Sequence, residues 1–421
     1  MSQRRKWFAA VACLTLAALL PSGPAGAAPA GQVELDFWVS FGGASAAVLN
    51  EALQDFHQMY PHIKVTVTPA SSGEKLFLAI ASGSPPDLAM MHGGEYSVLG
   101  MQGNLEPLDP LIEAYAGFTF DDLAPGYDLL GIYDGVRYAL PFWDTAPSYA
   151  LLYNTAMWDA TGLPRLSRNA APTWEEVAEF HRKLTVITGD GQVVQVGFHP
   201  KEGWHRQSYT IETLWDAPLY EANYRPKIDT PELTYALTKL KEYFVDPTPE
   251  ILNINPSFLS RTTAMYVHGP TLIGNRAAPL GGDLDVAWAP HITGTKAQRW
   301  RAWAMGIPKG TQHLPEVMLL VTYLLTNQEA IDLMWEKGGA FTANRQYLLN
   351  KELNDTLRWY IDTLFTAEKI VVEDMSPMKN ALQDAVTFAA NDVLDGREPP
   401  ENALAIRQRE AMARWEEIYG R

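Results

Sequence analysis

Aromatic residues stand beside acidic, basic and hydroxyl residues at several points along this 421-residue chain. The densest group is Glu202, Trp204, His205 and Arg206. Such a mixture suits a sugar, because a sugar presents a flat apolar face ringed by hydroxyl groups that a carboxylate or guanidinium can bind in pairs. These residues therefore indicate a binding site for a hydroxyl-rich solute.

Further groups of the same character follow segments that are predicted to be strands. Open α/β folds bind ligands beyond the carboxyl ends of their strands. The complete set of candidate ligand-binding residues is Trp38, Ser40, Phe41, Met91, His92, Glu95, Trp143, Asp144, Thr145, Glu202, Trp204, His205, Arg206, Trp303 and Arg345. Core packing for Trp38 and a solvated turn for His92 to Glu95 stay open as alternatives.

The common catalytic motifs are missing from the sequence. It contains no H-E-x-x-H, G-x-S-x-G or G-x-x-x-x-G-K-[ST] motif, and its 9 histidines lack the spacing of metal ligands. We therefore expect a protein that binds its ligand without chemistry and uses no catalytic residue, metal or cofactor. The 49 acidic residues still permit a pair of glycosidase carboxylates, so a secreted carbohydrate hydrolase is the alternative from another functional class.

The N-terminal segment has the pattern of an export signal. Arg4 to Lys6 are basic, Trp7 to Leu20 form an apolar run, and Ala25 to Ala27 offer a cleavage site. This pattern predicts a signal peptide over residues 1–27 and export to the periplasm or the outer cell surface. The single cysteine, Cys13, lies in this segment, so the mature chain would contain no disulfide. A membrane anchor, a lipid on Cys13 and twin-arginine export stay open.

Composition and charge indicate a folded, acidic protein. Hydrophobic residues make up 47% of the chain and charged residues 19%, and the length suits two domains. The chain carries 33 basic and 49 acidic residues, which gives a net charge of −16. Nucleic acid and anionic membrane surfaces would repel such a protein, so we expect neither as a partner.

Alternating strands and helices must position the candidate residues. Residues 33–38 alternate as a strand, residues 46–56 place apolar side chains on one helical face, and residues 63–67 alternate again. This βαβ unit predicts a parallel sheet. Thr173 to Glu176 form a capping box that begins a helix, and Thr326 to Glu329 predict the start of another. The pattern as a whole predicts an α/β fold with two lobes.

Several ordered segments match the motifs of one protein family. Ala81 to Leu88 match A-x-G-x-x-P-D-[VIL], Tyr133 to Pro141 are close to Y-x-G-K-x-Y-G-L-P, and Thr263 to Pro270 match the first residues of A-M-x-x-x-G-P-W. With these segments, the chain resembles the extracellular solute-binding proteins of bacterial ABC importers, in the sugar-binding family that includes maltose-binding protein. The likeness extends from about Val33 to the C-terminus.

The resemblance implies a two-lobed periplasmic-binding-protein-like fold, in which each lobe is a mostly parallel sheet flanked by helices. Three crossing segments would join the lobes, and the ligand would lie in the cleft between them. On this analogy, lobe one comprises residues 31–143 and 303–340, and lobe two comprises residues 147–300 and 345–421. Trp303 would then lie on the second crossing and Arg345 near the third.

The resemblance also implies a function. We expect a monomeric, exported component that captures a mono- or oligosaccharide by lobe closure and delivers it to the permease and ATPase subunits of an ABC importer. The same fold binding a polyol, a glycerol phosphodiester or a peptide stays open. The chain departs from the family at Thr271, where many members carry tryptophan, and at Thr342 to Arg345, where P-V-R is common. Both departures concern the ligand rather than the fold.

Overall fold

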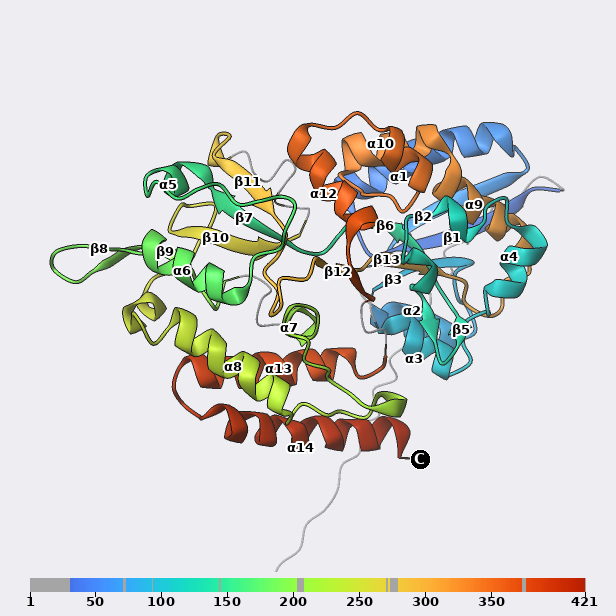
Figure 1. Ribbon diagram of the computed structural model, residues 1–421. Helices are drawn as coiled ribbons and strands as arrows, with labels where there is room; N and C mark the ends of the chain where they lie inside the picture. The colour runs from blue at the N-terminus through green and yellow to red at the C-terminus, as the bar shows by residue number, and fades with distance from the viewer. Residues whose placement is uncertain are drawn as a thin grey trace, which may run out of the picture.

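Two five-stranded sheets form the framework of the protein (Figure 1). The computed structural model describes residues 31–70, 73–92, 94–143, 145–202, 208–269, 272, 279–372 and 376–420. The predicted signal peptide lies outside the described residues, as do Asp144, Trp204, His205, Arg206 and Thr271. In the part of the chain that is described, no helix combines the length and the apolar character of a membrane span.

The first sheet contains the predicted βαβ unit. Its strands lie in the order β2 (Ile63–Pro69), β1 (Val33–Val39), β3 (Leu88–His92), β13 (Trp303–Gly306) and β6 (Leu140–Trp143). The first three strands are parallel, and β13 is antiparallel to both β3 and β6. The parallel pairing predicted for residues 33–38 and 63–67 is thus confirmed. Because β13 enters from much later in the sequence, this sheet is completed only when the chain returns to it.

Six helices in the described part of the chain surround the first sheet, and their apolar side chains face it. They are α1 (Gly43–Met59), α2 (Gly73–Ala81), α3 (Glu95–Met101), α4 (Asp109–Tyr115), α9 (Leu314–Thr326) and α10 (Gln328–Gly338). The side chains of α1, α9 and α10 pack with β1 and β2 in one hydrophobic cluster. Short 3₁₀ turns η1 (Phe120–Asp122) and η2 (Tyr127–Leu129) and the hairpin of β4 (Ile132–Tyr133) and β5 (Val136–Arg137) complete this part.

The second sheet is mixed. Its strands lie in the order β11 (Leu284–Ala287), β7 (Ala150–Asn154), β10 (Thr263–His268), β9 (Val193–Phe198) and β8 (Val186–Ile187). Strand β10 is antiparallel to β7 and parallel to β9. The elements around it are α5 (Thr155–Asp159), α6 (Trp174–Leu184), α7 (Ser208–Trp215), η3 (Ala222–Tyr224), α8 (Pro231–Phe244), η4 (Pro249–Asn253), α13 (Lys379–Leu394) and α14 (Pro400–Tyr419). Helices α13 and α14 form an antiparallel pair below this sheet (Figure 1).

Two helix starts test the local predictions. The capping box is confirmed: the Glu176 backbone N–H donates to the Thr173 hydroxyl at 3.2 Å, and the Glu176 carboxylate accepts from the Thr173 N–H at 2.7 Å. The predicted cap at Thr326 is wrong, because Asn327 caps α10 by accepting from the Ala330 N–H at 2.9 Å. Thr326 instead ends α9, and its hydroxyl donates to a carbonyl one turn back. Asparagine and threonine both favour this position, so the residue types could not decide between them.

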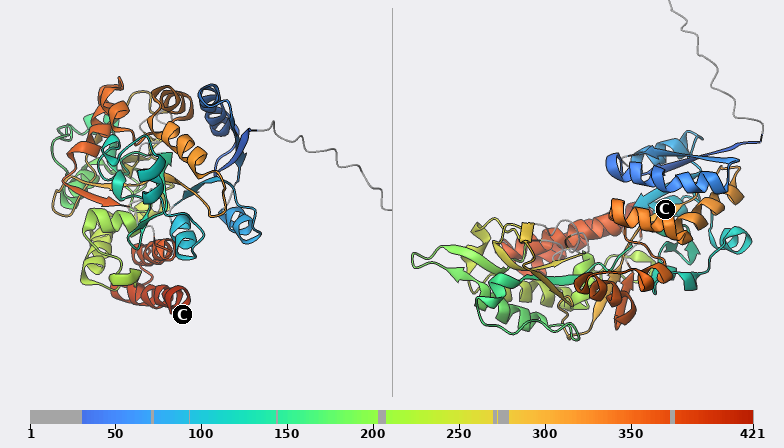
Figure 2. Two further views of the ribbon diagram at one scale, coloured as in Figure 1. Left: turned by 90° about the vertical axis from the view of Figure 1, so that its right-hand side faces the viewer. Right: turned by 90° about the horizontal axis from the view of Figure 1, so that it is seen from above.

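The chain passes between the sheets at two described places, from β6 to β7 and from β12 (Ala297–Trp300) to β13. Strand β12 pairs with β14 (Lys369–Val372) in a small separate sheet. A third hydrophobic cluster lies where these segments meet and includes side chains from both five-stranded sheets. The two sheets therefore share a packed central region around the crossings, and Figure 2 shows the elongated molecule that results.

Two further helices, α11 (Arg345–Asn350) and α12 (Asp355–Thr366), lead from α10 towards β14. Helix α11 is attached to α10, since the Tyr347 hydroxyl donates to Asp332 at 2.7 Å and Lys351 pairs with the same carboxylate at 2.6 Å. Helix α12 contacts β11 of the second sheet. The segment between α11 and α12 thus leads from the first group of helices to the second.

Candidate ligand-binding site

An aromatic row lies along one edge of the first sheet. Strand β3 ends at His92, β6 ends at Trp143, and the antiparallel β13 begins at Trp303 between them. The ring centroids of His92 and Trp303 are 4.4 Å apart, and those of Phe41 and Trp143 are 4.6 Å apart. This is the carboxyl edge of the parallel strands, where open α/β sheets bind ligands. Four predicted site residues, far apart in the sequence, are brought together here.

The neighbours of this row differ in what they can offer a ligand. Met91 is fully buried, because side chains alternate along β3 and Met91 points away from the His92 face into the central cluster. Thr145 is also fully buried, and both its backbone N–H and its hydroxyl donate to the Phe341 carbonyl, at 3.1 and 2.7 Å. The structure therefore places Met91 and Thr145 in the interior, where neither side chain is exposed to a ligand.

Trp38 and Ser40 use their polar groups within the protein. The Trp38 indole N–H donates to Asp36 at 2.7 Å, and the Ser40 hydroxyl donates to the Met90 carbonyl at 3.3 Å. The cavity that both residues line measures about 10 Å³, which holds a single water molecule at most. Their place at the end of β1 is as predicted, but the space beside them is too small for a sugar.

A larger cavity lies between helices α2 and α3, which cover the first sheet, and the start of α13, which lies beside the second sheet. Its volume is about 280 Å³, and its walls are Glu74, Phe77, Gly94, Glu95 and Val98 from the side of α2 and α3 and Ser376, Pro377, Lys379 and Asn380 from the start of α13. The Glu95 carboxylate accepts from the His92 backbone N–H at 2.8 Å, which connects this cavity to the aromatic row. Burial raises the pKa of Glu95, while the His92 N–H and the charge of Lys379 oppose that rise. The cavity thus has a partly buried carboxylate on one wall and a cation on the other.

A second cavity, of about 320 Å³, lies beside Glu202 at the edge of the second sheet. Three of its rings are stacked: Phe258 and Tyr266 have centroids 5.7 Å apart, and Tyr266 and His268 have centroids 5.0 Å apart, each pair within 16° of parallel. Tyr266 and His268 lie two residues apart in β10, so they face the same side of the sheet. His268 pairs with Ala150, the first residue after the crossing from β6.

The Glu202 carboxylate faces this stack of rings. Its Oε1 accepts from the Phe258 backbone N–H at 2.6 Å. Burial raises the pKa of Glu202, and the hydrogen bond from the Phe258 N–H opposes that rise. Burial, assisted by the charge of Glu202, also raises the pKa of Tyr266 to about 12. An aromatic platform and a carboxylate are thus combined in one cavity, which is the combination that a sugar requires.

The sequence prediction named Glu202 but missed Phe258, Tyr266, His268 and Lys379 as cavity-lining residues. For Tyr266 and His268 a signal existed, since the sequence alternates these two residues with apolar Met265 and Val267, and they are the polar-tipped rings nearest the end of β10. No local pattern identified Lys379 as a cavity residue, because a lysine at the start of a helix has no distinguishing neighbours in the sequence.

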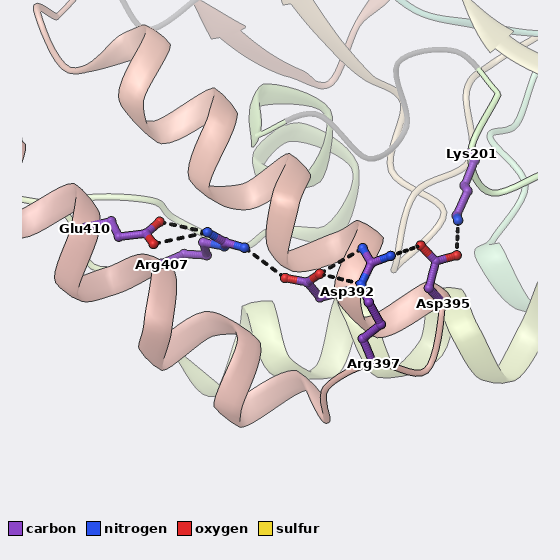
Figure 3. A network of polar contacts seen from close by, with 6 residues as sticks. All are labelled: Lys201, Asp392, Asp395, Arg397, Arg407 and Glu410. Atoms are coloured by element: carbon purple, nitrogen blue, oxygen red, sulfur yellow. Dashed lines mark hydrogen bonds and ion pairs between the residues drawn. The ribbon is translucent and has the colours of Figure 1, made fainter.

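A chain of ion pairs begins at Lys201, the neighbour of Glu202 in the sequence (Figure 3). Charges of opposite sign alternate along it, in the order Lys201, Asp395, Arg397, Asp392, Arg407 and Glu410. Arg397 contacts Asp395 at 2.7 Å and Asp392 at 2.8 Å. Burial alone would raise the pKa of Asp392, but hydrogen bonds from Arg407 and Arg397 hold it below its usual value. The network attaches the segment that carries Glu202 to helices α13 and α14.

Arg345 stands apart from these cavities. It is exposed in the first turn of α11, and among the described contacts none joins it to another candidate residue. Asp144, Trp204, His205 and Arg206 lie outside the described residues, so their predicted roles stay predictions. Within the described ranges, no group of three histidine, cysteine, aspartate or glutamate side chains is arranged to hold a metal ion.

Solved structures similar to this chain include receptors with a bound sugar. A structure titled CpMnBP1 with mannobiose bound has a TM-score of 0.74 at 20% identity, over 90% of this chain and 100% of that one. An ABC transporter solute-binding protein from Thermotoga lettingae, bound with α-D-tagatose, has a TM-score of 0.67 at 24% identity, over 91% and 100%. The maltose/maltodextrin-binding domain MalE from Bdellovibrio bacteriovorus, bound to maltotriose, has a TM-score of 0.67 at 20% identity, over 91% and 99%. These likenesses establish the two-lobed fold.

The family itself is established from the sequence. A comparison with curated protein sequences finds no significant match. The family profile described as bacterial extracellular solute-binding protein, in contrast, matches residues 42–331, which is more than half of the chain. The two α/β lobes and the cavity between them agree with this match. The chain therefore belongs to the bacterial extracellular solute-binding proteins.

Proposed function

We propose that the protein is the exported receptor of an ABC importer and that it captures a mono- or oligosaccharide between its lobes. One observation carries the proposal: each five-stranded sheet presents aromatic rings next to a partly buried glutamate. These are His92 and Trp303 with Glu95 in the first sheet, and Tyr266 and His268 with Glu202 in the second. Phe77 of the first cavity and Tyr266 of the second cavity both pack against the same central hydrophobic cluster.

The chemistry of the two walls favours a neutral, hydroxyl-rich ligand. A carboxylate accepts hydrogen bonds from two neighbouring hydroxyl groups, and an aromatic ring covers the C–H face of a sugar. The cavities, of about 280 and 320 Å³, are each near the lower limit for small-molecule sites. Proteins of the same fold were solved with mannobiose, tagatose and maltotriose. Together these points support a sugar over a peptide or a glycerol phosphodiester.

We further propose the division of the chain into lobes. Lobe one would comprise residues 31–143 and 303–340, and lobe two residues 147–300 and 345–421. The attachment of Tyr347 and Lys351 to α10 changes one boundary of this division: α11 would move as part of lobe one, and lobe two would resume only after Lys351. Closure would then rotate the lobes about three segments and bring the two aromatic walls together.

Export and delivery complete the proposal. The basic and apolar N-terminal pattern supports export, to the periplasm or the outer cell surface. The closed, loaded form would be recognised by the permease, whose ATPase subunits drive uptake. No group on the protein would react with the ligand in this cycle.

Tryptophan fluorescence provides the test of the ligand class. The chain has 13 tryptophans, and Trp143 and Trp303 lie in the aromatic row, so binding of a sugar should change the emission in a saturable way. The purified protein is titrated with mannobiose, maltotriose, tagatose, polyols, a glycerol phosphodiester and short peptides. Micromolar or tighter binding of a sugar supports the proposal, whereas binding of peptides alone would refute it.

A second measurement on the same samples separates a receptor from a hydrolase. The protein is incubated with each oligosaccharide, and new reducing ends are measured over several hours. We expect none, because a receptor releases its ligand intact. Release of reducing ends that disappears in Glu95→Gln or Glu202→Gln would establish a carbohydrate hydrolase instead.

A further inference from the structure

The turn that carries Glu202 is held by side chains rather than by regular secondary structure. It follows strand β9 directly, and the Glu202 N–H donates to the His199 carbonyl at 3.1 Å. The His199 ring is buried; its Nδ1 accepts from the Lys201 N–H at 3.2 Å, and its Nε2 donates to the Ile251 carbonyl at 3.1 Å. The start of the turn is therefore fixed to η4.

The Glu202 side chain lies where its charge is costly. Its Oε1 accepts from the Phe258 N–H at 2.6 Å, but its Oε2 is buried without a hydrogen-bond partner among the described residues. A buried oxygen without a partner costs free energy, and water would satisfy it if the side chain turned outwards. The carboxylate therefore stays beside Phe258 only while the turn holds its backbone in place.

Lys201, the residue before Glu202, attaches the turn to a distant part of the second lobe. Its ammonium group pairs with the carboxylate of Asp395, in the turn that follows α13 (Figure 3). The two side chains are only 24% and 26% exposed. Lys201 lines neither cavity, so this attachment lies outside the site that Glu202 lines.

The carboxylate of Asp395 is fixed by its own contacts. Arg397 pairs with it at 2.7 Å and with Asp392 at 2.8 Å, and Asp392 also accepts from Arg407 at 3.0 Å. The Arg397 N–H donates to the Asp392 carbonyl at 2.9 Å, which orders the backbone of the same turn. An exposed ion pair contributes little, because both of its side chains must be ordered when it forms. Here one partner is already ordered, so the pair with Lys201 loses less entropy.

We propose that Lys201 and Asp395 are positioning residues for Glu202: their ion pair fixes the turn and so holds the carboxylate at the second cavity. A site whose groups are already in place binds more tightly, because less entropy is lost on binding. The affinity for an uncharged sugar therefore depends on two charges that lie outside the cavity. This consequence rests on the proposed function, whereas the positioning of Glu202 does not.

Hydrogen exchange of one backbone amide tests the positioning without any ligand. The Phe258 N–H donates to Glu202 Oε1, so its protection reports whether the carboxylate is in place. The Thr262 N–H donates to the Ser257 carbonyl at 3.0 Å in the same segment and is the internal control. NMR measures the exchange of both amides in the purified protein at constant pH.

Substitutions separate the ion pair from general stability. Lys201→Met and Asp395→Asn each remove one charge and keep the length of the side chain, and Lys201→Arg keeps the charge. Lys227→Met is the matched control, because it breaks an exposed ion pair with Glu221 elsewhere in the second lobe. The double variant of Lys201→Met and Asp395→Asn completes the set.

We expect Phe258 to exchange about two- to tenfold faster in Lys201→Met and in Asp395→Asn, as for the loss of one stabilising contact. The double variant should add little to Asp395→Asn, because the two side chains act through one pair. Lys201→Arg and Lys227→Met should match the parent protein, and the Thr262 amide should not change.

Two results would overturn the proposal. One is an unchanged Phe258 exchange rate in both Lys201→Met and Asp395→Asn. The other is an equal acceleration of Phe258 and Thr262, which would show a general loss of stability rather than a displaced carboxylate. If Lys201→Met fails to fold, Asp395→Asn, which keeps the shape of its side chain, decides the question.

A sugar identified by the fluorescence titration adds a second readout. Lys201→Met should raise its dissociation constant about two- to tenfold, Lys201→Arg should restore the parent value, and Lys227→Met should have no effect. An unchanged dissociation constant in Lys201→Met and Asp395→Asn would overturn the consequence for affinity. If no sugar binds at all, the proposed function fails, while the exchange of Phe258 still decides whether the ion pair positions Glu202.

Discussion

We expect Glu202 to favour ligand binding and to lower the stability of the fold, and replacement by glutamine separates the two effects. The amide of Glu202→Gln has the same shape, and its oxygen can still accept from the Phe258 N–H, which lies 2.6 Å from Oε1. The new NH₂ group replaces Oε2, which is buried and has no hydrogen-bond partner among the described residues. Only the charge is removed, so the variant tests what the charge contributes.

The expected loss of affinity follows from the strength of charge-assisted hydrogen bonds. A hydrogen bond to a charged group contributes about 1.5–3 kcal/mol, and one between neutral groups about 0.5–1.5 kcal/mol. If the carboxylate accepts from two sugar hydroxyls, the variant loses about 1–3 kcal/mol of binding free energy, or roughly 5- to 150-fold in dissociation constant. Isothermal titration calorimetry at pH 7.5 with the sugar found by fluorescence measures this change.

Stability should change in the other direction. Burial raises the pKa of Glu202, so its charged form costs folding free energy at neutral pH, and that cost is removed as the pH falls through the raised pKa. Glutamine carries no charge to bury, so Glu202→Gln should have a melting temperature equal to that of the parent or slightly higher. Glu113→Gln, an exposed position in α4, is the matched control for both measurements. An unchanged dissociation constant, or a melting temperature lower by several degrees, would refute this account of Glu202.

Three further expectations concern the same structure. Burial raises the pKa of both Glu95 and Glu202, so affinity measured by fluorescence should fall on acidification from a higher pH than the ordinary glutamate value of 4.5 would give, and the double glutamine variant should lack this dependence. Gly126→Ala should lower the free energy of unfolding by about 3 kcal/mol or more, because its Cβ would lie 1.9 Å from Trp300 Nε1 at a φ of 88°, and urea denaturation measures this loss. Asp392→Asn should cost about 1 kcal/mol at low salt and less at 1 M salt, because it leaves two arginines without their shared carboxylate, and urea denaturation at both salt concentrations measures the difference.

Controls exist in the chain for each of these changes. Gly103 has a φ of 72° with open space around it, so Gly103→Ala measures the backbone cost alone, and an equal loss in both glycine variants would contradict the clash with Trp300. Glu410→Gln removes the exposed end of the ion-pair chain and should have little effect. A salt-independent loss in Asp392→Asn would argue against electrostatics, and an affinity that is flat down to pH 4.5 would contradict the raised pKa values.

Much of the fold could be predicted because its signals are local. The alternation in residues 33–38 and 63–67 and the helical face in residues 46–56 produced the βαβ unit that the structure contains. The capping box at Thr173 was recognisable because all its groups lie within four residues. The error at Thr326 has the same origin, since the adjacent Asn327 satisfies the same rule.

The candidate site could be predicted only in pieces. His92, Trp143 and Trp303 were each identified from an aromatic residue close to a polar one or from a family position, but their adjacency depends on β13 inserting between β3 and β6. Met91 and His92 are neighbours in β3 and were predicted together, but Met91 is fully buried and His92 is partly exposed. The cavity-lining roles of Tyr266, His268 and Lys379 arise from packing against distant segments, which no local pattern records.

The sequence by itself determined the elements, the family and the kinds of side chain that gather near strand ends. These depend on contacts between residues that are close in the chain, whose periodicity and hydrogen bonding are visible in the order of residues. Only the tertiary structure decided which of the aromatic and polar groups form a site. Glu202 was predicted to bind ligand together with Trp204, His205 and Arg206, which lie outside the described residues; the structure adds that Glu202 lies beside the Phe258, Tyr266 and His268 rings. That choice depends on strand order and on lobe packing, which join residues more than fifty positions apart.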